Sequence, residues 1–141
     1  MQKGITDFYL GTIKYSEEKI YKGKFELDKK TIEFYSYFNT DEDLEEMLKS
    51  ARSAIKNISN NYNEFKLYIA EQLLDLYNDD WSEAEVIDRE KFARRISLDS
   101  VMIYDRDSVE IYDRDADLFA EHFIAVDLTS EGKLEEPYLA G

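Results

Sequence analysis

The sequence contains no cysteine, which excludes disulfide bonds, thiolate metal ligands and cysteine nucleophiles. It contains a single histidine, so a metal site built from a pair of histidines is excluded as well. No apolar run approaches the roughly 20 residues that a membrane-spanning helix needs, and the N-terminal residues lack the basic and apolar regions of a secretory signal. We therefore expect a cytoplasmic protein that does not bind a membrane.

Glycine and proline are also scarce, with five glycines and one proline among 141 residues. No Pro/Gly/Ser-rich linker divides the chain, no Gly-rich phosphate-binding loop is present, and no Gly-x-Ser-x-Gly nucleophile motif can form. A chain of this length is one ordinary domain. The sequence therefore predicts a single domain over residues 1–141, without a recognisable catalytic motif and without a cofactor.

Aromatic and acidic residues, in contrast, are abundant. The chain has 11 Tyr, 8 Phe and 1 Trp, whereas disordered chains are poor in aromatic residues. It also has 32 acidic residues against 18 basic ones, which gives a net charge of −14. Such a charge repels nucleic-acid phosphates and attracts basic partners, although it also serves solubility alone. We expect a folded acidic domain that does not bind nucleic acid directly.

The N-terminal part of the chain, up to about residue 40, has the patterns of β-strands. Residues 8–15 are rich in aromatic and β-branched types, and residues 21–27 alternate between apolar and charged side chains. A turn is predicted at Asp28–Lys30. The strand predicted after this turn places three apolar side chains on one face: Ile32, Phe34 and Phe38.

The middle of the chain has the three- and four-residue spacing of helices. Thr40 is a predicted N-cap, because acidic residues follow it where they suit the helix dipole. Apolar residues recur with helical spacing from Leu44 to Ile58 and again from Phe65 to Leu76, and a break is predicted between them at Ser59–Asn63. Asp88 is a predicted N-cap of a short third helix.

Three further strands are predicted in the C-terminal part, at Ser100–Tyr104, Val109–Tyr112 and His122–Leu128, with charged turns between them. The order of strands, helices and strands favours the α+β class over a doubly wound fold. We expect an antiparallel sheet, formed by the N-terminal and C-terminal strand groups and packed against a central pair of helices.

Asp113, Asp115 and Asp117 form a D-x-D-x-D run, which resembles the opening of a calcium-binding loop. The next position of such a loop should be glycine but is Leu118, and the twelfth should be glutamate but is Ile124. The run therefore predicts a solvated turn and no metal site.

His122 is the only candidate for histidine-based catalysis, which would require a neighbouring carboxylate and a pocket. Strand alternation places it on the same face as Ile124 and Val126, so we expect a buried, hydrogen-bonded structural histidine. The alternative is a small enzyme or ligand-binding domain whose site includes His122 and Glu121.

The second half of the chain has a characteristic series of aromatic and apolar residues around one histidine. The series consists of Trp81, Phe92, Ile96, Leu98, Tyr112, Leu118, Phe119, His122 and Ile124. In this order it resembles an uncharacterised bacterial family, domain of unknown function 2262. The residue before the histidine is usually glycine in that pattern, and here it is Glu121. The resemblance implies no activity, but small acidic bacterial domains of this kind are often immunity proteins of toxin systems.

The acidic charge favours an immunity-type protein that binds and neutralises a basic toxin or effector. A nucleic-acid mimic of the phage-inhibitor type is a further alternative, which would require rows of carboxylates on one face. Trp81 is either an exposed anchor of the contact surface or a lid over the core at a helix end. The predicted contact surface consists of acidic loop residues and this tryptophan: Asp79, Asp80, Trp81, Glu83, Glu85, Asp105, Asp107, Asp113, Asp115 and Asp117.

Overall fold

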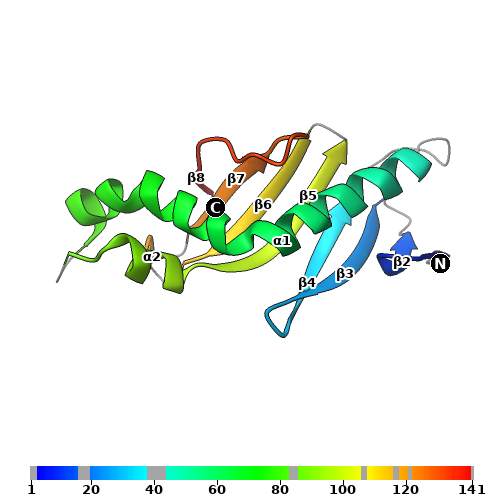
Figure 1. Ribbon diagram of the computed structural model, residues 1–141, viewed down its shortest axis with the longest axis horizontal. Coiled ribbons are helices and arrows are strands. Elements are labelled where there is room, and N and C mark those ends of the chain that lie inside the picture. Colours follow the sequence, from blue (N-terminus) through cyan, green and yellow to red (C-terminus); the bar gives the residue numbers. More distant parts are fainter. Residues whose placement is uncertain are drawn as a thin grey trace.

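The computed structural model describes residues 3–15, 20–37, 44–82, 86–105, 108–115, 118–120 and 122–140. The elements along the chain are β1 (Lys3–Asp7), β2 (Gly11–Tyr15), β3 (Tyr21–Leu27), β4 (Lys30–Ser36), α1 (Leu44–Leu76), the π-helical turn η2 (Tyr77–Trp81), α2 (Arg89–Arg95), β5 (Ser97–Asp105), β6 (Ser108–Arg114), β7 (Phe123–Leu128) and β8 (Tyr138–Ala140). The strands form one eight-stranded sheet in sequence order (Figure 1). The predicted α+β class, with N- and C-terminal strands in a single sheet, is confirmed.

The sheet consists of two antiparallel meanders, β1–β4 and β5–β8, which meet where β4 and β5 run parallel. In this parallel pair, Phe34 lies beside Val101 and Tyr35 lies beside Met102. A parallel pair requires a crossover connection, and the helical segment between β4 and β5 provides it. The helices thus connect the two meanders along the chain.

The long helix α1 crosses one face of the sheet (Figure 1). Its 33 residues make it roughly 50 Å long. Leu48, Ile55, Phe65, Ile69 and Leu73 are buried, as their spacing predicted. Because α1 covers this face, the side chains that alternate with the core positions of the strands lie on the other, open face.

The predicted break at Ser59–Asn63 is wrong, because α1 continues through these residues and replaces the expected pair of central helices with one long helix. Serine and asparagine are poor helix formers. However, Ile58 and Tyr62 are buried and continue the packed face of the helix, so tertiary packing overrides the local preference. The predicted N-cap Thr40 lies outside the described residues, whereas the predicted cap Asp88 is confirmed by a 2.8 Å hydrogen bond from the Lys91 amide.

Residues 8–15, predicted as one strand, contain a turn instead. Asp7 ends β1, and its Oδ2 accepts hydrogen bonds of 2.9 Å from the amides of both Tyr9 and Leu10. Gly11 then begins β2 with a φ of 74°, which favours glycine. β1 and β8 were both missed, because β1 has only one strongly apolar residue, Ile5, and β8 has three residues. Phe38, expected to face the core, lies outside the described residues.

Candidate functional site

The open face of the sheet carries five tyrosines, which we call the tyrosine face: Tyr35, Tyr37, Tyr104, Tyr112 and Tyr138. The strand registers bring them together. One row across the sheet runs from Tyr35 through Met102 and Glu110 to Asp127. The neighbouring row runs from Tyr112 through Ala125 to Tyr138. Strands far apart in the sequence therefore build one continuous surface.

Several of these rings are accessible to solvent. Tyr104 is 42% exposed and Tyr138 is 43% exposed. The rings of Tyr37 and Tyr104 stack, with centroids 5.2 Å apart. Tyrosine combines a large apolar ring with a polar tip, and contiguous exposed apolar surface is typical of interaction sites. The tyrosine face therefore has the character of a binding surface.

Glu110 lies at the centre of the tyrosine face and accepts hydrogen bonds from three tyrosine hydroxyls. Its Oε1 accepts from Tyr104 at 3.1 Å and from Tyr112 at 2.8 Å, and its Oε2 accepts from Tyr138. Burial opposes ionisation of Glu110, but the three hydrogen bonds outweigh it and lower the pKa of this carboxyl. Glu110 is therefore an ionised carboxylate in a fixed orientation, surrounded by aromatic rings.

A second carboxylate, Asp127, lies directly opposite Glu110 on the neighbouring strand. Burial raises the pKa of Asp127, and the charges of Glu110 and Glu135 raise it further. Like charges directly opposite each other destabilise a sheet. This pair therefore costs stability in the isolated domain.

Two other carboxylates on the open face form ion pairs with basic residues of the chain. Glu33 pairs with Lys22 at 3.0 Å, and Asp99 pairs with Arg114 at 2.7 Å. Among the residues that the structure describes, no lysine or arginine forms an ion pair with Glu110 or Asp127. Within the described part of the chain, the centre of the tyrosine face thus carries negative charge without a counter-charge.

The structure contradicts the prediction that Asp113 and Asp115 are solvated. They are 0% and 4% exposed. Asp113 lies on the helix face of β6 and accepts a hydrogen bond from Tyr62 of α1, and Asp115 accepts one from the Phe119 amide. The alternation of β6 explains this burial, because Val109, Ile111 and Asp113 point to the same side. These two carboxylates cannot contact a partner from their buried positions.

Among the remaining predicted acidic contact residues, Asp79 and Asp80 have described side chains, and both are exposed in η2 at the end of α1. The following predicted contacts lie outside the described part of the chain: Glu83, Glu85, Asp107, Asp117 and the side chain of Asp105.

Trp81 and His122 belong to an aromatic cluster around Phe119. The Trp81 ring lies edge-on to Phe119 at 5.4 Å and to His122 at 5.9 Å, and Phe92 lies 6.0 Å from Phe119. Trp81 is half-buried, which favours its interpretation as a lid over the core. Four residues of the family series, Trp81, Phe92, Phe119 and His122, thus pack together.

His122 differs from its prediction, because it is half-buried and its side chain forms no hydrogen bond with another described residue. It lies directly before the first residue of β7, and its ring packs edge-on against that of Trp81. Glu121, the other residue of the predicted ligand site, lies outside the described residues.

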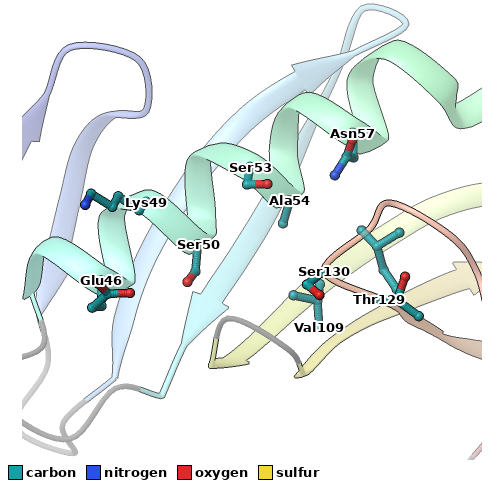
Figure 2. Close-up of a pocket in the computed structure, with 10 residues that line it drawn as sticks. Glu46, Lys49, Ser50, Ser53, Ala54, Asn57, Val109, Thr129 and Ser130 are labelled. Carbon is teal, nitrogen blue, oxygen red and sulfur yellow. The ribbon is translucent and has the colours of Figure 1, made fainter.

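A separate hollow of about 280 Å³ lies between α1 and the ends of β6 and β7 (Figure 2). Ser50, Ala54 and Asn57 of α1 face Thr129 and Ser130 across it (Figure 2). Ligand sites usually have volumes of roughly 300–1,000 Å³ and converging polar groups that fix a ligand. The hollow is small, and its lining mixes small polar side chains with one lysine and one glutamate. It is a weaker candidate than the tyrosine face.

Within the described residues, no three metal-ligating side chains come close enough together to hold an ion. In the same part of the chain, no helix is both long and apolar enough to cross a membrane.

Comparison with known proteins identifies the family. The family model described as "Uncharacterized protein conserved in bacteria (DUF2262)" matches residues 7–139. The match therefore extends well beyond the second half of the chain, in which the resemblance was seen, and runs from the end of β1 into β8. Searches of curated proteins and of solved structures found no match. The chain belongs to the bacterial family DUF2262.

Proposed function

We propose that this chain is an acidic protein-binding domain of the immunity type, which neutralises a basic toxin or effector by binding it on the tyrosine face. The observation that carries the proposal is the placement of five tyrosines and two uncompensated carboxylates on the sheet face that α1 leaves open. Tyrosine is enriched among the residues that dominate binding energy.

The charge of the molecule supports a basic partner. A net charge of −14 attracts a cationic protein and accelerates the encounter. The six strands from β3 to β8, spaced roughly 4.8 Å apart, span about 25 Å. A sheet face of this width is large enough to supply the roughly 800 Å² of surface that each partner contributes to an ordinary specific interface.

Two observations favour this function over a nucleic-acid mimic. A mimic requires carboxylates in rows at phosphate-like spacing, whereas the central carboxylate of the described open face, Glu110, is surrounded by three tyrosine hydroxyls that donate hydrogen bonds to it. Two open-face carboxylates are also neutralised by ion pairs with Lys22 and Arg114. Tyrosines beside a few charges are typical of surfaces that bind proteins.

The experiment is a pull-down with the full chain as bait, followed by binding kinetics with the recovered partner at low and high salt. Raising the salt should slow association more than it speeds dissociation, because electrostatic steering acts mainly on the association rate. Tyr104→Ala and Tyr138→Ala should each raise the dissociation rate by about tenfold, as expected of residues that contribute strongly to binding.

Tyr9→Ala is the matched control, because Tyr9 is 41% exposed but lies at the β1–β2 turn. It should leave the dissociation rate nearly unchanged. A partner whose association ignores salt would contradict the proposal. So would equal effects of the Tyr9 and Tyr104 substitutions, or the recovery of small molecules alone.

A further inference from the structure

We propose that the centre of the tyrosine face is a binding site for one arginine side chain of the partner protein, which Glu110 and Asp127 hold between the rings of Tyr104, Tyr112 and Tyr138. The inference rests on the proposed function, since it names the group that the basic partner presents. Its geometry comes from the registers of β5 to β8, which bring these side chains to one place.

Glu110 is oriented but not saturated. Three tyrosine hydroxyls donate to its two oxygens, and a carboxylate offers about four acceptor positions. Asp127 accepts no side-chain hydrogen bond from another described residue. The Cβ atoms of directly opposite residues are roughly 5 Å apart, so one donor group can reach both carboxylates. The site therefore retains acceptors for a cationic donor.

The electrostatic reason for a cation is the uncompensated repulsion between these two carboxylates. The other carboxylates of the open face, Glu33 and Asp99, have ion-pair partners within the chain. A positive charge from outside, placed between Glu110 and Asp127, would attract both carboxylates and so offset their mutual repulsion. Glu135, whose charge also acts on Asp127, adds to the negative potential at this place.

The surroundings favour a guanidinium group over other cations. Guanidinium is planar, donates from several N–H groups at once and stacks on aromatic rings, and here it would meet two carboxylates and exposed tyrosine rings. An ammonium group is a compact, strongly hydrated charge that gains less from the rings. A calcium ion would require six to eight oxygen ligands, more than this open surface supplies.

The test is an NMR titration of the isotope-labelled full chain with N-acetyl-arginine amide. Saturable shifts are expected at Glu110, Asp127 and the three tyrosines. Glu110→Gln keeps an oxygen acceptor for the tyrosine hydroxyls but removes the charge, and it should weaken binding of the probe by about tenfold or more. Asp127→Asn should weaken it in the same direction.

Two controls isolate the proposed site. Glu33→Gln removes an open-face carboxylate that Lys22 already neutralises, so it should leave probe binding unchanged. N-acetyl-citrulline amide has nearly the shape of the probe without its charge and should not bind. Shifts that do not saturate, equal binding of the citrulline probe, or normal binding by the Glu110→Gln variant would overturn the inference.

Two further probes test the chemical class of the ligand. N-acetyl-lysine amide should bind more weakly than the arginine probe, and equal or tighter binding would refute the assignment to guanidinium. Free arginine should bind no tighter than the blocked form. Tighter binding of free arginine would assign the site to a small molecule and not to a protein side chain.

Different experimental results would refute the arginine site and the proposed function. If a basic partner binds the tyrosine face but Glu110→Gln does not change its dissociation, the arginine site is wrong and the proposed function stands. If the arginine probe binds but no basic partner is found, the site stands and the proposed function fails.

Discussion

The carboxyl group of Asp113 lies between the sheet and α1, where its Oδ1 accepts a hydrogen bond from the Tyr62 hydroxyl. Its Oδ2 is buried and has no hydrogen-bond partner among the described residues. Burial raises the pKa of Asp113 to about 7, although the hydrogen bond from Tyr62 acts in the opposite direction. The folded domain therefore favours the protonated form of this acid below about pH 7.

This raised pKa makes stability depend on pH. Between the ordinary value of 3.8 and about 7, the folded chain holds the proton more tightly than the unfolded chain does. Stability should therefore fall as the pH rises through this window, by up to about 4 kcal/mol. Asp113→Asn should remove this contribution, because the amide has no proton to lose. Urea unfolding at about pH 5 and about pH 8 measures the difference for both proteins.

Asp7 does not interfere with this measurement. The hydrogen bond from Arg52 lowers the pKa of Asp7 to about 2, so its contribution to stability is lost only at more acidic pH. If the wild-type protein and the Asp113→Asn variant lose the same stability between the two pH values, Asp113 is not the source of the dependence.

The sequence alone contains conflicting signals about whether the side chain of Asp113 is buried. The alternation of Val109, Ile111 and Asp113 indicates an inward position, but the rule that charged residues face solvent indicated the opposite. The deciding partner, Tyr62, lies 51 positions away in the chain, and no local pattern connects the two. The tyrosines of the open face had a similar signal, since Tyr35 and Tyr112 occupy strand positions where a soluble domain usually has polar residues.

At the scale of elements, α1 is continuous through a segment of weak helix formers. Asn60 and Asn63 are exposed in the middle of the helix. Asn60→Ala and Asn63→Ala should each stabilise the domain by about 0.5 kcal/mol, because alanine is the better helix former. Asn60→Pro should instead cost about 3 kcal/mol or more, because proline cannot continue a helix. Chemical denaturation measures both effects, and a harmless proline would show that the helix is broken there.

The predicted helical spacing began and ended at the residues that bound α1, Leu44 and Leu76, and only the predicted break between two helices was wrong. The apolar spacing from Leu48 to Leu73 was visible in the sequence and correct in every buried position that it named. Its continuity depends on Ile58 and Tyr62, which pack against other parts of the fold. A local break signal can be overridden only by such packing, which the sequence alone does not show.

At the scale of the whole molecule, the net charge of −14 opposes the folded state, because folding brings like charges together. Raising sodium chloride from about 0.1 M to about 1 M shortens the screening length from roughly 10 Å to roughly 3 Å. The melting temperature should rise over this range. A constant or falling melting temperature would show that the acidic residues are too dispersed to repel one another appreciably.

The order of strands, helices and strands predicted the fold class, but not how the two strand groups join. Period-two alternation identifies a strand and its buried side, and it does not identify the neighbouring strand. The tyrosine face depends on the registers of β5 to β8, and the single sheet depends on the parallel contact of β4 with β5. For this reason the fold class was predictable and the candidate site was not.

The parallel contact between β4 and β5 also affects the kinetics of folding. Each meander is built from contacts between chain neighbours, which form quickly. The contact between Ser36 and Ile103, in contrast, closes a loop of more than about 60 residues before any pairing energy is gained. We therefore expect the two meanders to collapse separately onto α1 and their joining to be the slow step. Folding intermediates of this domain would expose the β4 and β5 edges, in addition to the outer strands β1 and β8, and chains in a crowded cell could pair wrongly there.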